Sequence, residues 1–126
     1  MEKKNLDNFL NLYKDFRENC IRVAKSISKM EWNYDYEDAA ECENFSINDD
    51  GRVFGIGWDT YAVDNELSCY FPIEFLLMTD EELEQLVIKE KIKHDEEIRQ
   101  EVKDLEEQIR KDELAELKRL QEKYGK

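Results

Sequence analysis

The chain has 126 residues, of which 40% are hydrophobic and 40% are charged, and its formal net charge is −13. This length fits one domain with a modest core, and the charged fraction predicts that part of the chain is a solvated element such as a long helix. No apolar run approaches the roughly 20 residues of a membrane span, and three widely spaced cysteines are typical of reduced thiols. We therefore expect a cytoplasmic protein with no membrane partner.

The negative charge is concentrated in the middle of the chain. Residues 31–78 contain twelve acidic residues and one basic residue, Arg52. Residues 1–30 have a small positive excess, and residues 89–126 are close to neutral. A field of this sign repels nucleic acid and attracts basic partners. We therefore expect no direct binding to nucleic acid.

The first predicted element is an amphipathic helix of about 25 residues. Apolar residues from Leu6 to Met30 recur at alternating steps of three and four, and neighbours such as Leu10 widen the stripe. A stripe of this width predicts that the helix packs against other elements of the domain.

A small antiparallel sheet is predicted next. Trp32, Tyr34 and Tyr36 alternate with polar residues, which predicts a short strand. The succession "FSI", "NDDG" and "RVFGIGW" predicts a hairpin with Gly51 in the left-handed conformation. "TYAV", "DNE" and "LSCYF" predict a second hairpin, and Pro72 ends its last strand. The sheet should therefore have three to four strands.

The last third of the chain predicts a long charged helix. Thr79 and Glu82 form the pattern of a capping box, and no Gly or Pro follows before Gly125. We therefore predict an α+β fold, with a helix-and-sheet core at 1–78 and a charged helical extension at 79–126.

One face of this long helix predicts association with a second helix. Ile98, Val102, Leu105 and Ile109 follow steps of four, three and four, which is typical of a coiled-coil seam, and we expect them to form a homodimer. The next apolar group begins after an offset of five, at Leu114. This offset leaves open a break near "RKDE" and a helical hairpin that folds on itself.

No residue pattern predicts catalysis, a cofactor or a metal. A calcium loop with Gly51 at its sixth place would begin at Ser46 and end at Gly57, so it lacks the terminal acid. Arg52 is the one cation between residues 31 and 88, which is too few for a lysine-assisted nuclease site. A single histidine, His94, does not predict a zinc site. We expect a protein that is not an enzyme.

The acids near the predicted turns are the candidates for function. Carboxylates along a sheet can imitate a phosphate backbone and occupy the basic groove of a nucleic-acid-binding protein or a nuclease. Most aromatic residues are interpreted as one face of the core, and two are interpreted as anchors for a partner. The predicted partner-binding residues are Asp49, Asp50, Asp59, Asp64, Glu66, Trp58 and Tyr61.

The arrangement resembles that of small acidic proteins encoded by phages and prophages. The likeness consists of the helix, the acidic aromatic sheet ending in "YFPIEFL", the helix start "TDEELEQL" and the charged end "LKRLQEKYGK". Some such proteins are anti-defence factors, including anti-CRISPR proteins. The resemblance implies an inhibitor that binds a basic defence or nucleic-acid-handling protein in the host cytoplasm, and it implies no individual site residue.

Two other functions are compatible with the sequence. A protein that sequesters a cyclic-nucleotide signal, here called a sponge, would bind it through cations of the long helix, at Arg99, Arg110 or Arg119. A structural or assembly accessory would act mainly through that helix. Stabilisation by a free nucleotide would distinguish the sponge, and deletion of residues 97–126 would disable the accessory.

Overall fold

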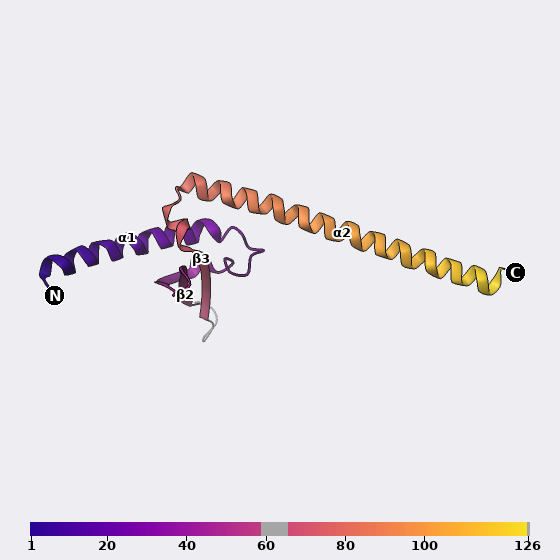
Figure 1. Ribbon diagram of the computed structural model, residues 1–126, viewed down its shortest axis with the longest axis horizontal. Helices are drawn as coiled ribbons and strands as arrows, with labels where there is room; N and C mark the ends of the chain where they lie inside the picture. The colour runs from indigo at the N-terminus through magenta and orange to yellow at the C-terminus, as the bar shows by residue number, and fades with distance from the viewer. Residues whose placement is uncertain (59–65, 126) are drawn as a thin grey trace. The chain divides into compact units, whose positions relative to one another are not determined.

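The computed structural model describes residues 1–58 and 66–125, and its fold is α+β (Figure 1). The chain forms two compact units, 1–90 and 91–126. The elements follow in the order α1 (Lys3–Ile27), η1 (Ala39–Glu41), β1 (Cys42–Ile47), β2 (Arg52–Trp58), β3 (Glu66–Pro72), η2 (Ile73–Leu77) and α2 (Asp80–Tyr124). The predicted order of helix, antiparallel sheet and long helix is confirmed.

Helix α1 has the predicted length of 25 residues, but only its second half is packed. Cys20, Val23 and Ile27 are fully buried, and α1 contacts β1, η1 and η2 (Figure 1). In the first half of the helix the same stripe is exposed, and Phe9 keeps 58% of its accessible surface. The expectation that the whole stripe packs within the domain is therefore wrong, because the small sheet is shorter than the helix.

The sheet has the strand order β1-β2-β3, and both pairs are antiparallel. The predicted first hairpin is confirmed, with Gly51 at a φ of 79° in its turn. Strand β3 pairs with β2 along its whole length, from Arg52 opposite Pro72 to Trp58 opposite Glu66. The predicted "TYAV" strand of the second hairpin lies outside the described residues.

The strand predicted at residues 32–36 is replaced by a series of turns. The carbonyl oxygen of Asn33 accepts hydrogen bonds from the backbone N–H groups of Tyr36 and Glu37. The side-chain oxygen of Asn33 accepts a third, from the N–H of Asp35 at 2.9 Å. These local bonds satisfy the backbone in a turn, so the alternating pattern does not need a strand partner.

These turns lie along the outer edge of β3. The backbone N–H of Tyr70 donates to the carbonyl oxygen of Asp35 at 3.1 Å. One long-range hydrogen bond thus fixes the segment around Asp35 against the strand.

Two glycines in β2 allow the core to close tightly. A Cβ atom at Gly55 would lie 2.7 Å from the Cys69 sulfur and 2.9 Å from the Phe45 ring. A Cβ atom at Gly57 would overlap the carbonyl oxygen of Glu41. Both glycines therefore allow a neighbour to approach more closely than a side chain would permit.

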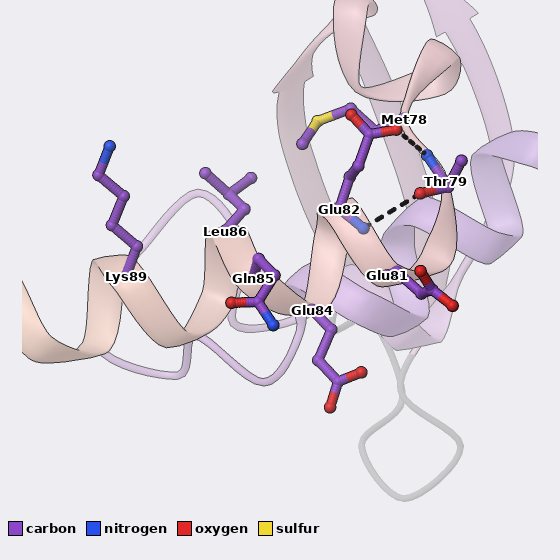
Figure 2. Close-up of a pocket in the computed structure, with 8 residues that line it drawn as sticks. All are labelled: Met78, Thr79, Glu81, Glu82, Glu84, Gln85, Leu86 and Lys89. Carbon is purple, nitrogen blue, oxygen red and sulfur yellow. Dashed lines mark hydrogen bonds between the residues drawn. The ribbon is translucent and has the colours of Figure 1, made fainter.

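The capping box at the start of α2 is confirmed. The N–H of Glu82 donates to the Thr79 hydroxyl at 3.1 Å, and the N–H of Thr79 donates to the Glu82 carboxylate at 3.2 Å (Figure 2). Arg22 joins this start to α1, because its guanidinium donates to the Asp80 carboxylate at 2.9 Å and to the carbonyl oxygen of Leu76 at 3.3 Å.

Helix α2 is continuous from Asp80 to Tyr124, so the hairpin break considered near "RKDE" is not present. Among the residues that the structure describes, no helix is both long and apolar enough to cross a membrane.

Candidate protein-binding surface

The side of the sheet that faces away from α1 carries a row of large side chains. Because side chains alternate along a strand, Val53 and Cys69 point into the core, whereas Phe54 and Tyr70 point outward. The Phe54 and Tyr70 rings lie on neighbouring strands with their centroids 4.8 Å apart. Further outward residues on β2 are Ile56, which is half-buried, and Trp58, which is 60% exposed. We call Phe54, Ile56, Trp58 and Tyr70 the outer aromatic face.

The outer aromatic face corrects the expectation that most aromatic residues belong to one core face. Phe45 and Phe71 are in the core, with Trp32 and Tyr36 packed at its margin. Phe54 and Tyr70 are not among the residues that pack against the core. The described aromatic residues are therefore divided between two sides of the sheet.

A pocket of about 230 Å³ adjoins this face at the edge of β3. The turns before η1 form one wall, and the outward side chains of β3 form the other. We call it the acidic pocket, and it is lined by Tyr34, Asp35, Glu37, Asp38, Glu66, Ser68 and Tyr70.

The acidic pocket combines negative charge with aromatic rings. Four of its lining residues are carboxylates and two are tyrosines, and among the described lining residues none is Lys or Arg. A water molecule occupies about 30 Å³ in the liquid, so the pocket has room for an ammonium or guanidinium group. Tyrosine rings and carboxylates both attract such cations.

The carboxylates of the described residues are not arranged as a metal site. Nowhere in residues 1–58 and 66–125 do three His, Cys, Asp or Glu side chains gather closely enough to hold a metal ion. The pocket is thus better suited to an organic cation than to a coordinated metal.

The local fold explains how the pocket forms. Asn33 shapes the turn at Asp35, and the Tyr70 N–H holds that turn against β3. Glu66, Ser68 and Tyr70 have two-residue spacing, so they share one side of the strand. The pocket therefore follows from one local turn and one contact between distant segments.

The structure brings two of the predicted partner-binding residues together. Trp58 and Glu66 are opposite each other in the β2–β3 register, and both are exposed. Asp49 and Asp50 are also exposed, but they lie in the turn at the other end of β2. A seven-residue strand spans about 20 Å, so the predicted acids form two groups rather than one.

Asp50 also has a structural role in this turn, because its carboxylate accepts a hydrogen bond from the Arg52 N–H at 3.1 Å. The other three predicted residues, Asp59, Tyr61 and Asp64, lie outside the described residues. The sequence interpretation did not include the pocket residues Tyr34, Asp35, Glu37, Asp38 and Tyr70 as partner-binding residues. A signal was present in the acidic connector that begins "YDYED", but the alternation was interpreted as a strand.

A second, larger pocket of about 610 Å³ lies over the first turns of α2. Figure 2 shows that its wall consists of side chains from the first turns of α2 and from Met78 and Thr79 just before the helix, with Glu82 used in the capping box. Glu81, Glu84 and Lys89 are exposed there, so the pocket mixes both signs of charge. Its shape and charge select no ligand class.

The cations considered for a nucleotide sponge lie exposed on α2. Arg119 is already paired with Glu116 through two hydrogen bonds, at 2.7 and 3.2 Å. This hydrogen bonding raises the pKa of Arg119 and lowers the pKa of Glu116. Arg119 is therefore already engaged by a carboxylate of its own helix.

The outer aromatic face and the acidic pocket together offer apolar contact beside a cation-binding recess. This combination is chemically suited to a basic, partly apolar surface of another protein. Comparison of the chain with protein-family models, with curated proteins and with solved structures found no match.

Proposed function

We propose that this protein is a non-enzymatic binding protein that captures a basic partner on the outer side of its sheet. The observation that carries the proposal is the acidic pocket directly beside the outer aromatic face. The pocket would receive a Lys or Arg side chain, and Trp58 would cover the apolar part of the contact.

Hydrophobic contact would supply much of the affinity. Protein interfaces are enriched in Trp, Tyr and Phe, and their energy is concentrated in a few such residues. Trp58 is 60% exposed, although burial of its ring would be strongly favourable. A partner that covers Trp58 and the neighbouring Ile56 would remove this apolar surface from water.

Charge would supply specificity and a fast encounter. The net charge of −13 attracts basic proteins over a range set by the salt concentration. The four pocket carboxylates would then pair with a cation at a defined position. A protein that normally binds nucleic acid has such cations, so its binding to this chain and to nucleic acid would be mutually exclusive.

The resemblance to phage-encoded anti-defence proteins supplies a biological setting for this proposal. In that setting the partner is a nuclease effector or another nucleic-acid-handling protein in the bacterial cytoplasm, and the chain blocks its groove.

The proposal is tested by competition with DNA. Purified bacterial nucleases and DNA-binding proteins are loaded with a fluorescent duplex, and the chain is added while anisotropy is recorded. We expect displacement of the duplex from at least one of them, and weaker displacement as salt is raised from 50 to about 300 mM because exposed charges are screened.

Two matched variants assign the displacement to the proposed surface. The triple change Asp35→Asn, Glu37→Gln, Glu66→Gln should weaken binding about tenfold or more. The control Glu96→Gln, Glu107→Gln, Glu122→Gln changes the net charge equally, at exposed positions of α2. Equal losses in the two variants would show that only net charge matters, and salt-independent binding would contradict mimicry.

A further inference from the structure

We infer that the seam of α2 pairs two copies of this chain in antiparallel orientation. The seam consists of Ile98, Val102, Leu105 and Ile109, which are between 45% and 61% exposed. Each is a large apolar residue flanked by charged side chains, and α2 also exposes a separate apolar group between Leu114 and Tyr124. A second helix with the same seam would cover all four.

The spacing fixes the position of every residue in the heptad. Because the step between Ile98 and Val102 is four and the next is three, Ile98 and Leu105 are at d, whereas Val102 and Ile109 are at a. The positions that flank the seam follow directly. Arg99 and Glu106 are at e, and Glu101 and Gln108 are at g.

A parallel pair would be opposed by these flanking charges. In a parallel coiled coil, each g residue faces the e residue five positions further along the other helix. Glu101 of one copy would therefore face Glu106 of the second copy, and symmetry would repeat this repulsion on the other side. Gln108 offers no compensating charge at the next position.

An antiparallel pair replaces the repulsion by attraction. In this orientation Ile98 packs opposite Ile109 and Val102 packs opposite Leu105, so that e residues face e residues and g residues face g residues. Arg99 then faces Glu106 of the second copy, and the two-fold axis makes the same pair twice. Glu101 faces the neutral Gln108.

Within each copy, the residues of these pairs are available to pair with the second copy. Arg99 and Glu106 are both exposed, and neither takes part in the ion pairs found among the described residues. The seam is also limited in length, because Leu114 is rotated by about 140° from Ile109 around the helix. We therefore expect a weak, concentration-dependent dimer held by the seam between Ile98 and Ile109.

Charge reversal distinguishes the two orientations by sedimentation equilibrium at low salt. Glu106→Arg should weaken the dimer about tenfold if it is antiparallel, because Arg99 then faces an arginine twice. The same change should strengthen a parallel dimer, because Glu101 would then face an arginine. Arg99→Glu should also weaken the antiparallel dimer, and the double change Arg99→Glu, Glu106→Arg should restore it.

A distance measurement supplies an independent test of orientation. Spin labels are attached at Lys91→Cys in both copies. In the antiparallel pair the two labels are offset by 25 residues along the axis, which separates them by about 37 Å. A parallel pair would place them about 10 Å apart.

Three outcomes would overturn the inference. They are a chain that remains monomeric at the highest concentration reached, a dimer that Glu106→Arg strengthens, and a short distance between the labels. Val102→Asp should abolish the dimer without changing the DNA-competition result, so failure here and failure of the proposed function are distinguishable.

Discussion

Cys42 and Cys69 show how closely the core depends on single residues. They lie on β1 and β3, with β2 between them, and their thiols are hydrogen-bonded to each other. All three cysteines, Cys20, Cys42 and Cys69, are free thiols and are buried.

We predict that all three cysteines are unreactive in the native protein. Burial raises the pKa of Cys20 to about 12, and the hydrogen bond with Cys69, followed by burial, raises the pKa of Cys42. Cys69 is fully buried. At pH 8 a thiol reagent such as DTNB should react with no cysteine in buffer and with all three in guanidinium chloride.

A control for access is Ser46→Cys, which places a thiol at an exposed position of β1 and should react at once.

The raised pKa of Cys20 also implies that this thiol stabilises the fold fully below pH 9. That contribution is lost as pH rises from about 9 to about 12. Rapid reaction of a native cysteine at pH 8 would contradict the packing described here.

At the scale of elements, the start of α2 depends on a small polar cluster. Thr79 and Glu82 cap the helix, Arg22 joins it to α1, and Leu83 of the first turn is fully buried. Because Leu83 belongs to the core, loss of the cap should affect the whole first unit.

Thr79→Ala should lower the free energy of unfolding by about 1 kcal/mol, the usual effect of removing a threonine cap. Urea denaturation followed by circular dichroism measures this change. Thr79→Ser retains a hydroxyl at the same position and serves as the control. An unchanged midpoint for Thr79→Ala would mean that the first turn of α2 contributes nothing to the cooperative unit.

Elements specified by local interactions could be predicted from the sequence. The periodicity of α1, the Gly51 turn and the capping box each depend on residues close together in the chain. The prediction of a strand around Tyr34 was wrong, because a turn held by the hydrogen bonds of Asn33 has the same alternation of aromatic and polar residues. The acidic pocket could not be predicted, since it depends on the hydrogen bond between Tyr70 and Asp35, 35 positions apart in the chain.

At the scale of the whole molecule, burial is confined to one part of the chain. The buried hydrophobic residues range from Cys20 to Leu83, and no described residue of the second unit is buried. The second unit therefore has no core of its own.

We predict that a chain ending at Glu90 folds by itself. Its thermal unfolding midpoint should stay within about 3 °C of the full chain at concentrations too low for dimerisation, because no core residue is removed. A chain ending at Met78, which lacks Leu83 and the capping box, is the comparison and should be much less stable. If the accessory function were correct, the chain ending at Glu90 would fold but lose function, whereas partner capture on the sheet would survive.

The close approach of Glu41 to Gly57 has a consequence for the history of this sequence. A side chain at position 57 would overlap a backbone oxygen, and backbone cannot give way as a flexible side chain can. Surface acids could be exchanged over many generations with little effect on folding. We therefore expect the glycine to persist even in descendants that bind a different partner and have lost much of the charge pattern, so "GIG" after an Asp-Gly turn is the better marker of common ancestry.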